Sequence, residues 1–220
     1  MNRMMMQILR LVVTMVILVM MAMMIFSLRH KVEDLERRLV ETNSSAESGL
    51  FETIRTRTSI RKFDSSVPVS DETIEQILRA GMCAPSAMNK QPWEFIVVRD
   101  AALLKALGEA LPYSHVKDGA TVAIVVCGNL DNGLPGRSKE YWIQDCSAVS
   151  MNILLAAKAL GLGAVWTGVY PGEDRVAIVR QLLTIPAGYM PLNVIPIGAP
   201  AENPPPKDKW APAKVHADRW

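Results

Sequence analysis

The sequence predicts one α+β or α/β domain over residues 50–220, preceded by an apolar N-terminal segment. Three observations support this. Half of the 220 residues are hydrophobic, which is enough for a single domain with a substantial core. Short apolar runs typical of strands alternate along the chain with longer segments of helical periodicity. An uncharged apolar run from Leu11 to Leu28 stands apart near the N-terminus.

The expected helices cover residues 50–56, 70–81, 100–111, 141–160 and 173–183. Ser70 and Asp100 are of the residue types that cap a first helical turn, and Asp71 and Glu72 complement the dipole of the helix that follows Ser70. The segment 141–160 is apolar on nearly all sides. This pattern predicts a helix buried both by the sheet and by a partner subunit.

The expected strands cover residues 93–98, 121–127, 164–168 and 192–197. The first two are near-continuous apolar runs, which predicts central strands covered on both faces. Three consecutive prolines, Pro204 to Pro206, exclude a helix or a central strand there, so the tail from about residue 203 is expected to be an extended arm.

The N-terminal run predicts a membrane anchor. Residues 11–28 are uncharged and bounded by basic residues. The length of this run is at the lower limit for a helix that spans a bilayer. We therefore expect residues 1–31 to be an uncleaved single-pass anchor in the lipid bilayer, with a cleaved signal as the alternative and the side of the membrane left open. Residues 32–49 read as a short charged helix followed by a flexible tether.

Charge and motifs exclude several classes of protein. The net charge is only +2, and basic and acidic residues are interspersed, so nucleic acid is not an expected partner. Cys83, Cys127 and Cys146 form neither a CxxC pair nor a metal-ligand cluster, so no metal site is predicted. The sequence contains no HExxH, P-loop or GxSxG motif.

A first candidate site is the segment Arg57-Thr58-Ser59-Ile60-Arg61, called here the arginine motif. The two arginines share a face whether the segment is helical or extended, and their like charges favour an anion between them. Thr58 and Ser59 add hydroxyl donors of the kind that bind phosphate oxygens. The alternative interpretation is a solvated basic segment from residue 55 to 62.

A second candidate is the loop from Ala84 to Trp93, punctuated by Pro85 and Pro92. Residues before proline are disfavoured in the helical region, so this backbone is irregular and its amides are available to a ligand. Asn89 carries the donor and the acceptor that the pyrimidine edge of a flavin or a nucleobase requires. The alternative is an ordinary turn in which Asn89 caps its own backbone.

Three blocks, residues 57–63, 84–95 and 163–171, together resemble the nitroreductase family of FMN-dependent oxidoreductases. The resemblance runs from about Leu50 to Trp220. It implies a mixed central sheet flanked by helices in a three-layer arrangement. It also implies a homodimer that binds FMN at the subunit interface, with the C-terminal arm wrapped around the neighbouring subunit.

The resemblance also implies roles for individual residues. The arginine motif is expected to hold the phosphate, the ribityl chain and the N1 to C2 carbonyl edge of the flavin, and Arg61 is the expected cation at that edge. The remaining expected contacts lie in the loop, in the strand end near flavin N5 and in the arm. The full set of expected FMN-binding residues is Arg57, Thr58, Ser59, Arg61, Pro85, Ser86, Met88, Asn89, Trp166, Thr167, Gly168 and Lys214.

The expected reaction is hydride transfer from NADH or NADPH to the flavin and then to a small acceptor, such as a nitroaromatic compound or a quinone, with ping-pong kinetics. The cofactor carries the chemistry, so no side chain is predicted to be catalytic. One alternative is a non-catalytic flavin-binding or scaffold protein. Another is a reductive dehalogenase like the membrane-anchored iodotyrosine deiodinases, although residues 112–131 lack the Glu, Tyr and Lys series of that group. His115 is either a substrate contact or a solvated loop histidine.

Overall fold

The computed structural model describes residues 14, 15, 18, 20, 21, 23–35 and 49–220. The chain divides into two compact units, residues 1–52 and 53–220. In the first unit residues 23–35 are helical. Residues 49–56 form a helix that leads into the arginine motif, and the Arg57 N–H donates to the Thr53 carbonyl at 2.9 Å.

The predicted membrane anchor is wrong. Among the described residues, no helix combines the length and the apolar character needed to cross a bilayer. The transmembrane part of the predicted fold, the single-pass localisation and the lipid partner are therefore corrected with it. Of the predicted span, residues 11–13, 16, 17, 19 and 22 lie outside the described residues, as do residues 36–48 of the predicted charged helix and tether.

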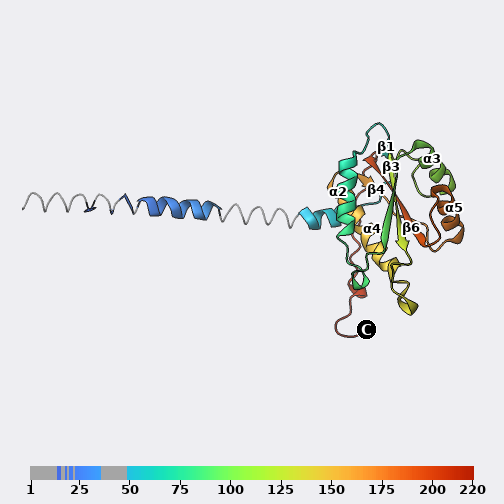
Figure 1. Cartoon of the computed structure of the whole chain (residues 1–220). Helices are drawn as coiled ribbons and strands as arrows, with labels where there is room; N and C mark the ends of the chain where they lie inside the picture. Colours follow the sequence, from blue (N-terminus) through green and yellow to red (C-terminus); the bar gives the residue numbers. More distant parts are fainter. Residues whose placement is uncertain (1–13, 16–17, 19, 22, 36–48) are drawn as a thin grey trace, which may run out of the picture. The chain divides into compact units, whose positions relative to one another are not determined.

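The second unit is built on a sheet whose longest strand, β6, has neighbours on both edges (Figure 1). The strand order is β1-β6-β3-β2, and β4 and β5 pair with β6 on the same edge as β1. A mixed sheet was expected, but every strand pairing among the described residues of one protomer is antiparallel. The strands are β1 (Phe63–Asp64), β2 (Trp93–Val98), β3 (Val122–Asn129), β4 (Gly163–Ala164), β5 (Thr167–Gly168) and β6 (Tyr189–Pro200).

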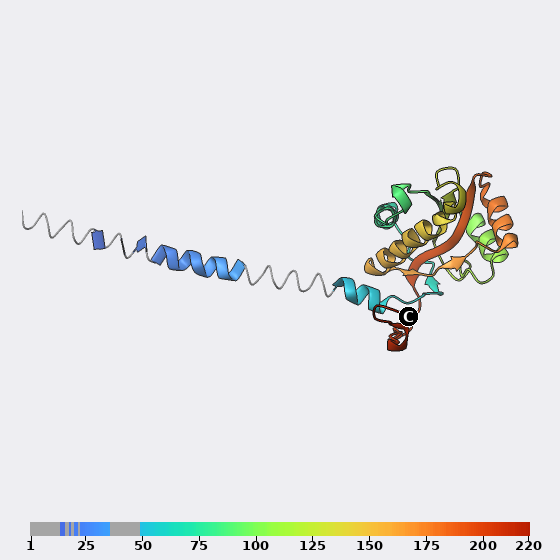
Figure 2. The ribbon, with the colours of Figure 1, turned by 90° about the horizontal axis from the view of Figure 1, so that it is seen from below.

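Helices cover both faces of this sheet and make three layers (Figures 1 and 2). The helices α2 (Asp71–Met82) and α4 (Tyr141–Ala159) pack on one face. The helices α3 (Ala101–Ala110) and α5 (Glu173–Leu183) pack on the other. Three short 3-10 turns complete the elements: η1 (Ala87–Asn89), η2 (Gly136–Ser138) and η3 (Pro212–Lys214). The three-layer α+β arrangement agrees with the prediction.

Strand β3 explains how one sheet serves two cores. Its side chains alternate between the two helical layers: Val122, Ile124 and Val126 face α2 and α4, whereas Ala123 and Val125 face α3 and α5. The prediction of a central strand is confirmed here. It is wrong for β2, which lies at the edge of the sheet with Val97 37% exposed. An apolar run does not reveal whether a strand has one neighbour or two.

The predicted helix starts are confirmed. The Ser70 side chain accepts a hydrogen bond from the Thr73 N–H at 3.2 Å, and Asp100 accepts one from the Leu103 N–H at 2.8 Å. Each cap satisfies a backbone donor that the first helical turn leaves unpaired. At the other end, Gly161 adopts a φ of 76°, a left-handed conformation that ends α4.

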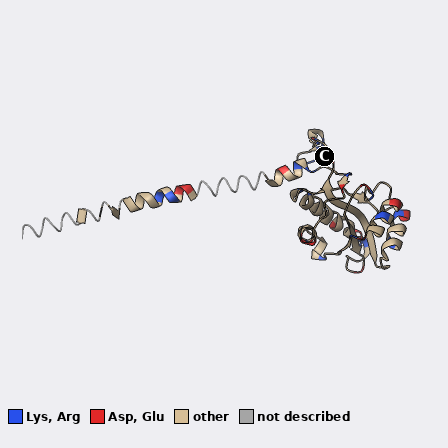
Figure 3. Ribbon diagram, turned by 90° about the horizontal axis from the view of Figure 1, so that it is seen from above, with Lys and Arg blue, Asp and Glu red and all other residues tan. Residues whose placement is uncertain are grey.

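The C-terminal tail extends along the outside of the domain. After Asn203 it contains only the short turn η3, and the side chains of Trp210 and Trp220 are 72% and 101% exposed. Figure 3 shows basic and acidic residues interspersed over the helices of the described domain rather than gathered by sign.

Candidate functional site

The arginine motif runs along the outside of β4. The Ile60 N–H donates to the Ala164 carbonyl at 3.1 Å, and the Ile60 side chain is buried against Gly163. A Cβ atom on Gly163 would lie 2.6 Å from Ile60 Cγ2, so only glycine allows this close approach. The buried Ile60 fixes the motif on the sheet, while Arg57 and Thr58 just before it stay at the rim.

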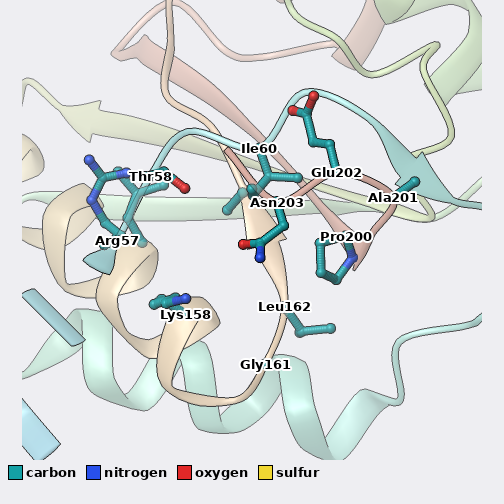
Figure 4. A pocket seen from close by; sticks show the side chains of 12 residues that line it. Arg57, Thr58, Ile60, Lys158, Gly161, Leu162, Pro200, Ala201, Glu202 and Asn203 are labelled. Atoms are coloured by element: carbon teal, nitrogen blue, oxygen red, sulfur yellow. The ribbon is translucent and has the colours of Figure 1, made fainter. Parts of the chain in front are cut away.

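Arg57 and Thr58 line a pocket of about 480 Å³ (Figure 4). The opposite wall comes from the end of α4 and the turn after it, including Lys158 and Leu162. Figure 4 shows the Arg57 and Lys158 side chains on neighbouring elements, with Asn203 opposite them. The polar groups around the hollow are two cations, a hydroxyl, an amide and the Glu202 carboxylate, so its charged side chains are net positive and suit an anion such as a phosphate group.

Arg61 and Ser59 lie outside the lining of this pocket. The Arg61 backbone N–H donates to a carboxylate oxygen of Glu202, and its guanidinium donates to the Ser59 carbonyl at 3.4 Å. Glu202, at the start of the C-terminal tail, therefore fixes the backbone of the motif. The Arg61 side chain is exposed and stays on its own segment.

Gly168, the last residue of β5, presents one backbone edge away from the sheet. The N–H of its neighbour Val169 donates to the Leu192 carbonyl of β6. Backbone N–H and C=O groups of successive strand residues point to opposite edges, so those of Gly168 point away from β6. The Gly168 carbonyl accepts a hydrogen bond from Arg175 at 2.8 Å. A Cβ atom on Gly168 would meet nothing within 4 Å, so the space beside it is open.

The other two residues of this predicted segment have different surroundings. The Thr167 hydroxyl donates to the Ser114 carbonyl at 3.3 Å, and Trp166 is 36% exposed. Thr167 is thus tied to the loop before β3, whereas Gly168 has open space where a Cβ atom would lie.

The loop 85–89 lies at the other end of α4 and is held by a buried carboxylate. Asp145, only 6% exposed, accepts a hydrogen bond from the Ala87 N–H at 2.9 Å. Lys158, on the same helix, lines the Arg57 pocket thirteen residues later, about 20 Å along the axis at 1.5 Å per residue. Within one protomer, the loop and the Arg57 pocket are therefore separated by most of the length of α4.

The loop itself has a strained backbone and exposed side chains. Met88 and Asn89 have φ values of 51° and 54°, and the Met88 side chain is 81% exposed. The Asn89 side chain accepts a hydrogen bond from the side-chain amide of Gln91 at 2.9 Å, and the Ser86 hydroxyl accepts one from the backbone N–H of Gln91. Asn89 thus pairs with a neighbouring side chain and not with its own backbone.

Replacing Asp145 by alanine should loosen this loop. The change leaves the half-buried Ala87 N–H without its charged acceptor, which should lower the free energy of unfolding by about 1–3 kcal/mol. Limited proteolysis should then cut faster between residues 86 and 91. Asp145→Asn keeps an acceptor oxygen and serves as the control. An alanine variant with the stability and protease resistance of the wild type would show that the carboxylate does not hold the loop.

The comparisons with known proteins identify the family. The model of the Nitroreductase family matches residues 54–114 and 109–199. The chain belongs to the nitroreductase family. A protein of Methanothermobacter thermautotrophicus, assigned as an NADH dehydrogenase/NAD(P)H nitroreductase, is 50% identical over 174 residues, which cover 78% of this chain and 87% of that protein.

Solved structures agree with this membership. A Parabacteroides distasonis protein with the same assignment is 46% identical, with a TM-score of 0.73 and coverage of 78% of this chain and 98% of that one. A nitroreductase of Desulfovibrio desulfuricans, solved in complex with FMN, is 33% identical, with a TM-score of 0.64 and coverage of 77% and 96%. The family inferred from the three sequence blocks is confirmed.

Of the predicted FMN-binding residues, Arg57 and Thr58 are the two that line the Arg57 pocket. Lys214 lies in η3 of the tail and is not among the residues that line the Arg57 pocket. Lys158 lines that pocket and is not among the residues predicted from the sequence. This helix was predicted only from its apolar residues, and the lysine in its last turn, just before Gly161, is the one local signal that the sequence carried.

Two of the three cysteines of this nitroreductase are chemically protected. Burial raises the pKa of the Cys127 thiol to about 12, with the nearby Glu94 charge as a smaller cause. Burial also raises the pKa of Cys146, to which the charge of Asp145 adds. Cys83 is exposed.

This arrangement predicts the thiol chemistry of the folded chain. Because the thiolate is the reactive form and a raised pKa keeps a thiol neutral, Cys127 and Cys146 should stay unreactive at neutral pH. Ellman's reagent should titrate one thiol in the native protein and all three in denaturant. Rapid titration of more than one thiol in the native protein would contradict the burial of Cys127 and Cys146.

Proposed function

We propose that this nitroreductase is an FMN-dependent oxidoreductase that takes hydride from NADH or NADPH and reduces a small acceptor, such as a nitroaromatic compound or a quinone. The observation that carries the proposal is the position of two features on one edge of β6. The Arg57 pocket adjoins Ala164, which pairs with Ile197, and Gly168 pairs with Asn193. Ile197 and Asn193 are four residues apart on β6, which is about 13 Å along the strand.

The residues on this edge fit FMN. A phosphate needs cations and hydroxyl donors, which Arg57, Lys158 and Thr58 supply around one pocket. A planar ring needs open space and a hydrogen-bond donor at its edge, which Gly168 supplies. The separation of the two features suits a molecule whose phosphate and ring are joined by a five-carbon chain.

When bound, FMN supplies the hydride chemistry. The chain then has three tasks. Arg57 and Lys158 hold the phosphate, and the outward N–H of Gly168 donates to an acceptor atom of the ring. Arg61, on the motif fixed by Glu202, supplies positive charge on the side where negative charge develops during reduction.

We further propose that the site is shared between two copies in a homodimer. The loop 85–89 is about 20 Å from the Arg57 pocket along α4, so the loop of a second copy is better placed to complete the site than the loop of the same chain. The exposed aromatic residues of the tail support a second copy as well, since Trp210 is 72% exposed and Trp220, which stacks on His216 of the same tail, is 101% exposed.

Mixed dimers test the shared site. Chains carrying Arg57→Ala and Asn89→Ala, each with its own affinity tag, are coexpressed and the doubly tagged dimer is isolated. If each site is shared, one site of the mixed dimer is built from the unmutated arginine motif of one chain and the unmutated loop of the other. That site is intact, so about half of all sites should bind FMN. A mixed dimer that binds no more FMN than either variant alone would place both halves of each site in one chain.

Steady-state kinetics of the FMN-loaded chain test the reaction. With NADH or NADPH as donor and menadione or nitrofurazone as acceptor, a ping-pong enzyme gives parallel lines in double-reciprocal plots. Intersecting lines would contradict the proposed sequence of steps. A flavin-loaded chain that reduces none of these acceptors would favour the alternative of a binding or scaffold protein.

A further inference from the structure

Of the described residues that line the Arg57 pocket, Glu202 is the one that carries a carboxylate. Its side chain is half-buried, and one of its carboxylate oxygens accepts the Arg61 backbone N–H. Figure 4 shows the side chains of Arg57 and Lys158 on one side of the pocket and that of Glu202 on the other. No ion pair among the described residues joins Glu202 to either cation. The pocket therefore has a positive side and a negative side.

The course of β6 places Glu202 at the end of the pocket that is farther from Gly168. Gly168, where the proposed function puts the flavin ring, pairs with Asn193 of β6. Pro200, which lines the pocket, is seven residues farther along the same strand, about 23 Å, and Glu202 follows two residues later. A chain of atoms that starts at the ring and continues past the first phosphate therefore approaches Glu202.

A flavin monophosphate and a flavin dinucleotide present different charges to such a pocket. FMN ends in a single phosphate, which carries a charge of roughly −1.5 to −2 at neutral pH and can be held by Arg57 and Lys158. FAD continues through a second phosphate to an adenosine. That second negative charge would extend toward the Glu202 carboxylate, and like charges brought together in this way disfavour a ligand.

We propose that Glu202 restricts this site to a flavin monophosphate: its carboxylate repels the second phosphate of a dinucleotide such as FAD, while one of its oxygens holds the arginine motif in place. The inference rests on the proposed function and deepens it by naming the residue that selects the cofactor. Specificity here comes from an unfavourable contact with the wrong ligand. The two actions of Glu202 are separable, because the hydrogen bond needs only an acceptor oxygen, whereas the repulsion needs the charge.

The experiment measures the affinities of the full-length chain for FMN and FAD by equilibrium dialysis, at low and at high salt. The main variant is Glu202→Gln, which keeps an acceptor oxygen for the Arg61 N–H but removes the charge. Glu202→Ala removes both. Glu109→Gln, on α3 and outside the lining of the pocket, removes the same charge and is the matched control.

The wild type should bind FMN more tightly than FAD, and Glu202→Gln should reduce this preference about fivefold. This is the size expected for two charges about 10 Å apart near a protein surface with partial screening by salt. High salt should reduce the preference of the wild type and leave that of Glu202→Gln nearly unchanged. Glu202→Ala should weaken the binding of both flavins, because the motif loses its acceptor, and Glu109→Gln should keep the preference of the wild type.

Two results would overturn this inference alone. The first is a Glu202→Gln chain that binds FMN as the wild type does and keeps the full preference over FAD, which would assign the preference to the shape of the site. The second is a wild-type preference that salt does not change. A wild-type chain that takes up neither flavin overturns the proposed function as well.

Discussion

Replacing Arg57 by alanine should weaken FMN binding about 30-fold while leaving riboflavin binding nearly unchanged. Arg57 lies in the same pocket as Lys158, and a charged hydrogen bond of this kind contributes about 2 kcal/mol. Because riboflavin lacks the phosphate, the difference between the two ligands isolates the contact assigned to the guanidinium. Fluorescence quenching of each flavin on titration with protein measures both affinities.

The matched control is Arg79→Ala. Arg79 is exposed on α2, pairs with Glu75 on the same helix and does not line the pocket, so its loss removes the same charge from outside the site. Lys158→Ala should weaken FMN binding in the same selective way as Arg57→Ala. If Arg57→Ala weakened FMN and riboflavin equally, the phosphate assignment would be wrong and the effect would come from the ring or from the fold.

Replacing Gly128 by alanine should destabilise the domain by about 3 kcal/mol. A Cβ atom at this position of β3 would lie 2.3 Å from Cε3 of Trp142, a rigid ring that is only 5% exposed. Trp142 cannot yield easily, because its other side packs edge to face on Tyr170 with ring centroids 5.1 Å apart. Overpacking of this kind costs about 1–3 kcal/mol, and the rigid neighbour puts this site at the upper end.

A double-mutant cycle separates this contact from a general effect of alanine in a strand. In a Trp142→Ala background the space is already open, so adding Gly128→Ala should cost little or nothing further. Urea unfolding of the four chains gives the coupling energy. A cost that is the same in both backgrounds would mean that Trp142 is not the obstacle. Because Trp142 lies in the first turn of α4, close to Asp145, Gly128→Ala should also loosen the loop 85–89.

The sequence predicted well those features that depend on neighbouring residues, such as helix caps and the burial of β3. Ser70 and Asp100 cap the helices that follow them because short polar side chains reach unpaired N–H groups wherever a helix begins. The continuous apolar run of β3 is buried on both faces for an equally local reason. Such predictions depend only on residues adjacent in sequence.

Features that depend on distant partners were predicted less well. Strand β2 is as apolar as β3 but lies at an edge, since its position depends on which strands pair with β6 and β3. The apolar run 11–28 met the length criterion for a span, yet no described helix does. An uncharged apolar run of sufficient length is required for a helix that spans a membrane, but such a run does not by itself establish one.

The roles of the predicted FMN-binding residues stay predictions, but the structure shows where these residues lie. Arg57 and Thr58 do line a pocket, and Gly168 does present an open backbone edge. The second pocket cation, Lys158, was missed because it comes from a helix about a hundred residues later in the chain. The separation of the loop 85–89 from that pocket follows from the length of α4 and from the Asp145 contact, neither of which a motif records.

The central claim is that this chain binds FMN and accepts hydride from a nicotinamide. Its most direct test is an anaerobic titration of the full-length chain, incubated with FMN and freed of unbound ligand, followed by visible absorbance. The expected result is a yellow protein whose absorbance near 450 nm, the usual flavin band, is bleached by NADH or NADPH. A protein that stays colourless after incubation with FMN, or a yellow protein that neither nicotinamide bleaches, would contradict it.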